Sequence, residues 1–228
     1  MFIRERFNSP VTKINYSEDK VDVITKSGKV YQADKVLVTV SIGILKSDYI
    51  SFIPDISKEK KDAIESIVFL PGFKLVMKFS EKFYPDIIMC KAKTGEKGYY
   101  DMAFKKDAET HILGLLVQGS SVEDFYCLES EEHIVLKALE ELDQIFEGKA
   151  SKAYTGEYVF EDWGRHEFTQ GTWMESFLYD QSIIQALNES LNDKVFFAGE
   201  VNDLHHQLGV PGAIVSGYHS IDKLLTSL

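Results

Sequence analysis

The sequence predicts a mixed α/β or α+β protein with two sheets rather than one. Short β-branched apolar runs alternate along the chain with segments whose apolar residues recur at helical spacing. Hydrophobic residues make up 44% of the 228 positions, which is enough to bury one large core or two modest ones. No Gly-, Pro- or Ser-rich linker separates two halves, so any second domain must be interleaved with the first.

The N-terminal part of the chain is predicted to be strands. Residues 11–16 alternate between apolar and polar, and residues 21–25 and 29–31 flank Ser27-Gly28. This pattern indicates a hairpin, because Gly supplies the positive φ of a tight turn. Residues 36–40 are apolar on both faces, which is typical of a strand buried inside a sheet.

Further strands are predicted at residues 73–79, 111–117, 154–160 and 195–198. In the first of these, strict alternation places Phe73, Leu75, Met77 and Phe79 on one face and Lys74, Val76 and Lys78 on the other.

Four helices are predicted between these strands. One begins at Ser57 and carries the apolar stripe Ala63, Ile64, Ile67 and Val68. A second is capped by Ser130, has acidic residues in its first turn and ends at Gly148. The others cover residues 181–191 and 212–225.

Charge and composition exclude several classes of partner. The formal net charge is −11, and an acidic surface repels nucleic acid and anionic lipid. Cys90 and Cys127 form neither a disulfide framework nor a zinc knuckle. Residues 1–6 are charged too early for a signal peptide, and the longest apolar run, residues 36–45, is too short to span a bilayer. A soluble, cytoplasmic chain without nucleic-acid or membrane contact is expected.

The C-terminal helix carries small residues near one face: Gly212, Ala213, Ser216, Gly217 and Ser220. Such a face lets either a flat ligand or a neighbouring backbone approach closely, and the helix N-terminus suits a developing anion. Spacing alone favours simple helix–sheet packing. The neighbouring His205, His206 and Asp203 invite a metal interpretation, but adjacent loop histidines lack helical ligand spacing, so no metal is expected.

Four segments, in order, resemble the FAD-dependent amine oxidases, a family that includes monoamine and polyamine oxidases and flavin-dependent histone lysine demethylases. They are residues 33–46, residues 74–79 followed by Phe83-Tyr84, Trp163 with Gly171-Thr172-Trp173, and residues 197–200 with 212–217. Together they cover nearly the whole chain, which makes the resemblance far more specific than any one motif.

The resemblance is to the C-terminal half of such enzymes. It implies that residues 1–45 and 191–228 form part of a FAD/NAD(P)-binding Rossmann-like domain, and that residues 46–190 form an interleaved mixed-sheet substrate-binding domain. The N-terminal dinucleotide-binding βαβ unit is absent, since no G-x-G-x-x-G run occurs. An expressed fragment, a truncated reading frame and one subunit of a split enzyme all fit this pattern.

The resemblance also implies roles for individual residues. Lys74, which spacing alone would make a solvated strand lysine, matches a catalytic lysine that holds a water against flavin N5. Trp173 matches an aromatic ring that faces the flavin and binds substrate. The second ring of monoamine oxidases is replaced by Gly209, which argues against a simple monoamine as substrate.

Contacts to FAD are implied for six residues. Glu200 matches a carboxylate that binds a ribityl hydroxyl, and Gly209, Val210 and Ala213 lie beside the ring and ribityl portion. Val11 matches a residue that meets the adenine, and Trp163 is expected to pack beside the flavin. Thr172 stands where monoamine oxidases carry the cysteine that bonds to FAD, so the flavin is expected to be non-covalent.

The implied reaction is oxidation of an amine C–N bond to an imine, with FAD accepting hydride and oxygen giving hydrogen peroxide. The isolated chain is expected to be inactive and to bind FAD weakly. Implied partners are a small-molecule amine and either a separate N-terminal half or a second copy joined through exposed sheet edges. Two alternatives remain: a non-catalytic truncated paralogue or partner-binding module, and a desaturase- or protoporphyrinogen oxidase-like flavoprotein.

Overall fold

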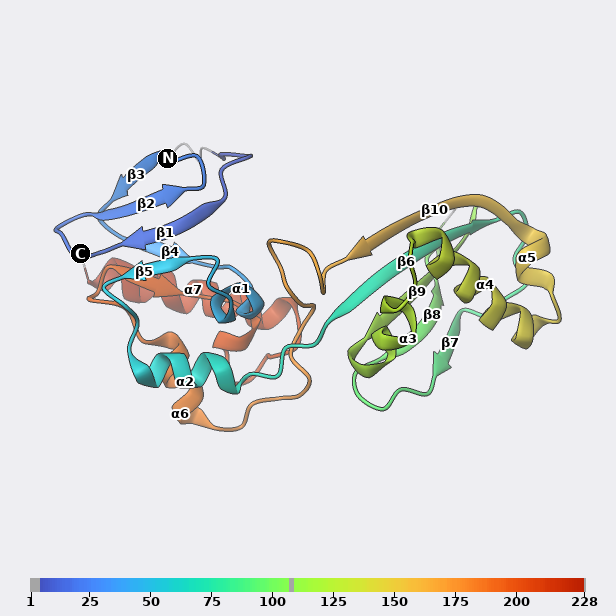
Figure 1. Ribbon diagram of the computed structural model, residues 1–228. Coiled ribbons are helices and arrows are strands. Elements are labelled where there is room, and N and C mark those ends of the chain that lie inside the picture. The colour runs from blue at the N-terminus through green and yellow to red at the C-terminus, as the bar shows by residue number, and fades with distance from the viewer. Residues whose placement is uncertain (1–4, 107–108, 228) are drawn as a thin grey trace. The chain divides into compact units, whose positions relative to one another are not determined.

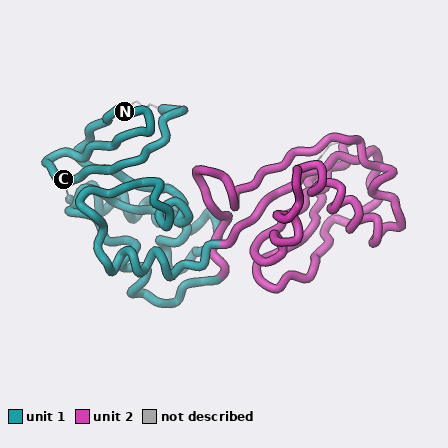
Figure 2. The backbone as a smooth tube through the Cα atoms, viewed as in Figure 1, with its two compact units in different colours: residues 1–69, 176–228 teal, residues 70–175 magenta. Residues whose placement is uncertain are grey.

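The computed structural model describes residues 5–106 and 109–227 and divides into two compact units (Figures 1 and 2). Unit 1 combines residues 1–69 with residues 176–228, and unit 2 is residues 70–175. The interleaving predicted from the missing linker is therefore observed. The division falls at 69/70 and 175/176, whereas the sequence predicted 45/46 and 190/191, because the helices on either side of unit 2 in the chain pack together within unit 1.

Unit 1 contains a four-stranded sheet in the order β3-β2-β1-β5. The predicted hairpin joins β2 to β3, and Gly28 adopts φ +81° in its turn. The strand β5, which the sequence did not predict, is only three residues long and pairs parallel with β1. The bounds are β1 Val11–Asn15, β2 Val21–Thr25, β3 Val30–Ala33 and β5 Ser51–Ile53.

A second sheet of unit 1 has two parallel strands, β4 (Val36–Val38) and β11 (Val195–Phe197), with Val36 opposite Val195. The side chains of β11 are buried, whereas Val36 and Leu37 are half-buried rather than buried as predicted. The helices of unit 1 are α1 Ile42–Lys46, α2 Lys58–Ser66, α6 Gln181–Asn188, η2 Glu200–Asn202 and α7 Val210–Thr226.

Helices α2 and α6 are joined by a buried lysine. The Lys60 ammonium on α2 donates to the carbonyl oxygens of Ala186, Leu187 and Glu189 at 2.9, 2.7 and 2.9 Å. These carbonyls lie at the C-terminal end of α6, where Ala186 O also accepts the Glu189 N–H at 3.4 Å and Leu187 O also accepts Asn202 Nδ2 at 3.3 Å. Ser57 caps α2 as predicted, but α2 ends at Ser66, so Val68 is exposed instead of extending the apolar stripe.

Unit 2 is built on a five-stranded sheet in the order β10-β6-β9-β8-β7, in which every pairing is antiparallel. The predicted alternation is confirmed: Phe73, Leu75, Met77 and Phe79 are buried, and the residues between them are half-buried. The bounds are β6 Gly72–Phe79, β7 Ile87–Cys90, β8 Lys97–Asp101, β9 His111–Gln118 and β10 Tyr154–Asp162.

Helix α4 (Glu131–Phe146) supplies the other wall of the unit 2 core. Ser130 caps it as predicted, and the helix ends in Glu147 and Gly148, both with positive φ. Its buried residues join the sheet core through Ile134, Val135, Ala138, Leu139 and Leu142. Shorter helices are η1 Gly119–Val122, α3 Glu123–Tyr126 and α5 Lys149–Ala153. Within the described residues, no helix combines the length and apolar character needed to cross a membrane.

Candidate active site

The residues that the sequence singled out fall into two groups, one in each unit. The unit 1 group surrounds the N-terminus of α7. Gly209 caps this helix in an extended conformation, without a hydrogen bond from any side chain. Val210 and Ala213 in the first turn are exposed. The first turn of α7 is therefore an uncapped, accessible helix N-terminus with partial positive charge.

The backbone packs tightly around this helix N-terminus. A Cβ on Gly212 would lie 2.3 Å from the carbonyl oxygen of His206 and 3.3 Å from that of Glu200. Ser216 Oγ donates to the Gly199 carbonyl at 2.8 Å, and Ser220 Oγ donates to that of Phe197 at 2.6 Å. Gly212, Ser216 and Ser220 thus pack against the end of β11 and the following loop, as spacing alone favoured, whereas Ala213 is exposed and a Cβ on Gly217 would meet nothing within 4 Å.

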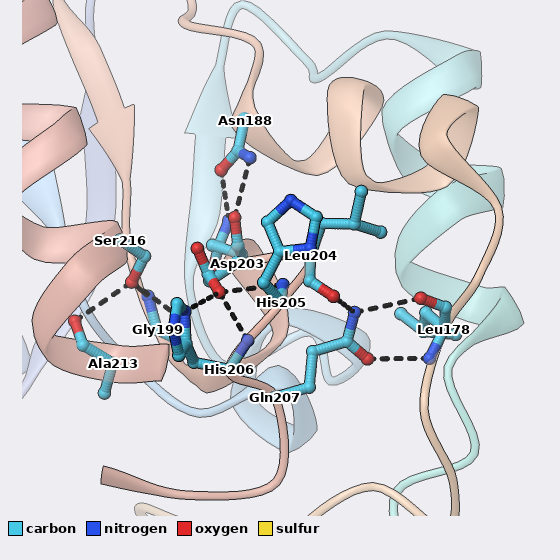
Figure 3. A network of polar contacts seen from close by, with 11 residues as sticks. Leu178, Asn188, Gly199, Asp203, Leu204, His205, His206, Gln207, Ala213 and Ser216 are labelled. Carbon is cyan, nitrogen blue, oxygen red and sulfur yellow. Dashed lines mark hydrogen bonds and ion pairs between the residues drawn. The ribbon is translucent and has the colours of Figure 1, made fainter. Parts of the chain in front are cut away.

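A polar network holds this loop in place (Figure 3). The buried Asp203 carboxylate accepts the backbone N–H groups of His205 and His206 at 2.9 and 2.6 Å, and lies 3.0 Å from His206 Nδ1. Burial raises the pKa of Asp203, but these bonds from His206 and His205 outweigh burial and leave it below its usual value. In the described part of the chain, no three His, Cys, Asp or Glu side chains are placed to hold a metal ion.

Two amide side chains anchor the same loop to α6 and to the segment before it. Leu178 N–H donates to Gln207 Oε1 at 2.6 Å, and Gln207 Nε2 returns a bond to Leu178 O at 3.0 Å. Asn202 Nδ2 donates to Asn188 Oδ1 at 3.0 Å. Sequence reasoning missed Asp203 as an anchor and missed Gln207 and Asn202 altogether, because isolated polar residues in a loop carry no periodic signal.

Val11, the residue expected to meet adenine, lies on β1 opposite Thr25 and is half-buried. It belongs to the four-stranded sheet, whereas Glu200 follows β11 of the parallel pair. Both sheets contribute to one apolar cluster of unit 1, to which Val11 and Phe197 belong.

The unit 2 group is centred on Lys74. This residue pairs with Leu116 of β9 and Glu161 of β10 and is half-buried. Its ammonium lies 5.8 Å from the ring centroid of Trp163 and 5.4 Å from that of Tyr100. A cation between two rings at this distance is held by cation–π attraction. Lys74 is thus held in place by aromatic side chains rather than simply solvated.

Tyr100 was not predicted for this group. Its hydroxyl is buried and has no hydrogen-bond partner among the described residues, and its ring lies across Gly114, where a Cβ would meet Tyr100 Cζ at 3.0 Å. Residues 97–101 do not alternate between apolar and polar side chains, so no local pattern predicted the strand that carries Tyr100.

The segment that contains Trp173 is fixed to the start of β6. Thr172 Oγ1 donates to Leu70 O at 2.9 Å and accepts from Gln118 Nε2 at 2.9 Å. Leu70 N–H in turn donates to Trp173 O at 3.1 Å. Gly164 N–H donates to Gly72 O at 2.9 Å, which brings the segment after Trp163 to the same strand end.

The structure therefore brings Lys74 and Trp163 together and fixes the Trp173 backbone beside the same strand, while Glu200, Gly209, Val210 and Ala213 gather at α7. The α7 group fits one portion of FAD: an open helix N-terminus and a close-packed glycine backbone suit a flat ring and a ribityl chain. A glycine-rich phosphate-binding turn is absent from the sequence.

Comparison with known proteins assigns the class. The profile of the family described as flavin containing amine oxidoreductase matches residues 4–223. This match identifies the class of protein as a flavin-containing oxidoreductase. The chain belongs to the flavin-containing amine oxidoreductase family, as the four segments predicted.

Individual relatives agree with this assignment. The chain is 26% identical to lysine-specific histone demethylase 1B of Mus musculus, over 96% of this chain and 27% of that protein. It is 27% identical to polyamine oxidase 1 of Zea mays, over 97% of this chain and 45% of that protein.

Solved structures show the same fold. Cyclohexylamine oxidase from Brevibacterium oxydans IH-35A superposes with a TM-score of 0.76 at 17% identity, over 95% of this chain and 48% of that one. A putrescine oxidase variant redesigned in cofactor binding superposes with a TM-score of 0.77 at 17% sequence identity. The match covers 97% of this chain and 49% of that one. The chain spans less than half the length of each of these four relatives.

Proposed function

We propose that this chain supplies the lysine- and aromatic-bearing portion of a flavin-dependent amine oxidase. The observation that carries the proposal is the half-buried Lys74 ammonium between the rings of Trp163 and Tyr100, on the strand whose start also fixes the Trp173 segment. Family membership supports FAD as the cofactor and an amine as the substrate. Thr172 carries no thiol and is engaged by Gln118 and Leu70, so FAD is held without a covalent bond.

FAD, when bound, would accept a hydride from the carbon beside the amine nitrogen and pass two electrons to oxygen, giving an imine and hydrogen peroxide. Lys74 would hold a water and supply a fixed positive charge that favours charge transfer to oxygen. Trp173 would present one aromatic wall to the incoming amine and exclude water.

The unit 1 residues would hold the cofactor. The Glu200 carboxylate would accept a ribityl hydroxyl, and the backbone of Gly209, Val210 and Ala213 would line the ring portion. Val11 would offer its backbone to the adenine. These contacts leave the pyrophosphate without a glycine-rich turn, so residues outside these 228 would supply that part. We place the protein in the cytoplasm, in keeping with its acidic surface.

Weak FAD binding by the isolated chain is the first expected outcome. Equilibrium dialysis of the purified chain against FAD should leave it colourless at micromolar cofactor, because the pyrophosphate has no cradle. Purification with one tightly bound FAD per chain, in the absence of any other protein, would contradict this expectation.

The test of the proposed function is Lys74→Met in the chain assembled with FAD and its completing polypeptide. Loss of one fixed charge in a dry site costs on the order of 3 kcal/mol, so reoxidation by oxygen should slow about a hundredfold. Anaerobic reduction by amine should change little. Stopped-flow absorbance of the flavin follows each half-reaction separately.

Lys78→Met is the matched control. Lys78 lies on the same face of β6, but its ammonium pairs with Glu157 at 2.8 Å near the other end of the strand. Its replacement should leave both half-reactions unchanged. Equal oxidative rates for the Lys74 variant and its parent would remove the proposed role of Lys74.

A further inference from the structure

We propose that Asp162 is a positioning residue for the candidate active site: its carboxylate fixes the end of β10 and thereby holds the Trp163 ring against the Lys74 ammonium. The catalytic value of that contact rests on the proposed function. Trp163 comes directly after β10, whose pairing with β6 ends at Asp162 opposite Phe73. Strand ends fray when nothing else holds them, so a ring that stays 5.8 Å from an ammonium at this point needs a further support.

Three hydrogen bonds converge on the Asp162 carboxylate. Tyr126 Oη donates to Oδ1 at 2.7 Å, the Arg165 backbone N–H donates to the same oxygen at 3.0 Å, and Arg165 Nε donates to Oδ2 at 2.6 Å. The Asp162 side chain is only 14% exposed, so these charge-assisted bonds are partly shielded from water. They tie the end of β10 both to helix α3 and to the turn that follows Trp163.

The two donors are themselves held in place. The Arg165 guanidinium carbon lies 4.0 Å from the centroid of the Tyr126 ring, a stacked cation–π contact. The Tyr126 ring also contacts the fully buried Phe73, with 6.2 Å between the ring centroids. Burial, the hydrogen bond to Asp162 and the charge of that carboxylate raise the pKa of Tyr126. The phenol therefore stays protonated and continues to donate at neutral pH.

Strand alternation explains how Asp162 can act on a contact that it does not make. Successive side chains of an extended strand point to opposite faces of the sheet. Asp162 lies opposite Phe73, a residue of the unit 2 core, whereas Trp163 contacts Lys74, which is on the other face of β6. Asp162 therefore anchors the backbone from the core side. It is a positioning residue, and Lys74 and Trp163 are the side chains that face the site.

The backbone after Trp163 is fixed in a complementary way. The Trp163 carbonyl accepts from Thr169 Oγ1 at 2.7 Å and from the Gly171 N–H at 2.9 Å. Gly164 allows the chain to pass close to the anchor, because a Cβ there would lie 2.4 Å from Tyr126 Oη. The loop thus holds the C-terminal side of Trp163, and Asp162 holds its N-terminal side.

The test follows the contact between Lys74 and Trp163 in the purified, isotopically labelled chain. Nuclear Overhauser cross peaks between the Lys74 ε-methylene and the Trp163 indole report the contact, and Lys74→Met assigns them. Asp162→Ala should lower these cross peaks to less than about half of their parental intensity, since all three bonds are lost. Asp162→Asn should keep most of the intensity, because its amide oxygen still accepts from Tyr126 and from the Arg165 N–H.

Asp143→Ala is the matched control. The Asp143 carboxylate on α4 of the same unit also accepts a backbone N–H and a side-chain donor, both from Ser151. Its loss should lower the urea midpoint of unit 2 and leave the cross peaks unchanged. Tyr126→Phe removes one bond and keeps the ring, so it should give a smaller loss even if Asp162→Ala does not fold. Intact cross peaks in the Asp162 and Tyr126 variants, or an equal loss in Asp143→Ala, would overturn the proposal.

Stopped-flow kinetics of the FAD-loaded protein separate this proposal from the proposed function. Asp162→Ala should slow reoxidation by oxygen about tenfold, less than Lys74→Met does, and leave anaerobic reduction unchanged. Lost cross peaks with an unchanged reoxidation rate would keep Asp162 as the positioning residue and remove the proposed role of Lys74. Slowed reoxidation with intact cross peaks would overturn the positioning role and leave that of Lys74 in place.

Discussion

Helices α4 and α7 have nearly the same length, 16 and 17 residues, but they bury opposite kinds of side chain. Helix α4 of unit 2 buries five apolar residues and exposes Leu136 and Ile145, which lie on opposite sides of the helix. Helix α7 of unit 1 buries glycine and serine and exposes a continuous apolar face. The difference is that α4 closes the core of unit 2 with large apolar side chains, whereas α7 packs on unit 1 through small residues and leaves apolar side chains exposed.

The two units also differ in what holds them together. The core of unit 2 is a dense aromatic and aliphatic cluster around Phe73, Leu115, Phe125 and Leu142. Unit 1 relies more on buried polar side chains that bind backbone, such as Lys60 on the end of α6 and Ser220 on β11. The free energy of unfolding should therefore change with a substitution in different ways in the two units: through lost apolar packing in unit 2 and through lost hydrogen bonds and altered pH dependence in unit 1.

The largest expected effect is that of Leu142→Ala. Leu142 is fully buried in unit 2, so its truncation should lower the free energy of unfolding of that unit by about 3 kcal/mol. Both tryptophans, Trp163 and Trp173, lie in unit 2, so tryptophan fluorescence in urea reports on this unit alone. Ile214→Ala on α7 should leave that curve unchanged. An equal shift for both variants would show that the units unfold together.

The next effect is that of Lys60→Met, which should destabilise unit 1 by about 2 kcal/mol, because it removes the ammonium that donates to three carbonyl oxygens at the end of α6. Burial lowers the pKa of Lys60 to about 7, against an ordinary value near 10.5 in the unfolded chain. Above pH 7 the unfolded chain therefore binds more protons, and the stability of the parent rises with pH.

The difference between the parent and Lys60→Met should consequently grow by about 2 kcal/mol between pH 7 and pH 9. Urea unfolding followed by circular dichroism at the two pH values measures it. A difference that stays constant would show that the three carbonyls keep the ammonium charged throughout this range.

Two glycines of α7 should give effects of opposite sign, and that of Gly217→Ala is the smallest expected. Gly212→Ala places a Cβ 2.3 Å from a backbone oxygen and should cost about 1–3 kcal/mol. Gly217→Ala meets nothing within 4 Å and should stabilise the helix by about 0.5–1 kcal/mol. Thermal unfolding of both variants tests the pair. A Gly212→Ala variant at least as stable as its parent would mean that α7 is not packed against the loop before it.

The regular elements of the fold could be predicted because their local signals agree. The alternation of residues 73–79, the Ser130 cap and the Ser27-Gly28 turn each predicted an element that the structure contains. Short elements such as β5 and α1 escaped prediction, because three to five residues carry too little periodicity. The relative direction of paired strands could not be predicted from local sequence patterns. Residues 46–190 were expected to form a mixed sheet, but all strand pairs in the sheet of unit 2 are antiparallel.

The candidate site could be predicted only through resemblance. Without the resemblance, Lys74 would have been predicted to be a solvent-exposed strand residue. No rule of sequence spacing connects it to Trp163, which follows the end of β10. The roles of Tyr100, Asp203 and Gln207 depend on loop geometry and strand register, which no run of residues encodes.

The chain order of unit 1 has a consequence for synthesis on the ribosome. Strand β4 must wait for its partner, because Val36 pairs with Val195, 159 positions later. At about 5–20 residues per second this delay is roughly 10 to 30 s. All of unit 2 emerges during that interval and can form its own core, while the β1–β3 meander and β4 remain exposed. A nascent chain stalled before residue 195 should therefore present a folded inserted unit on a still unfolded host, a state in which chaperone contacts would concentrate on residues 36–38.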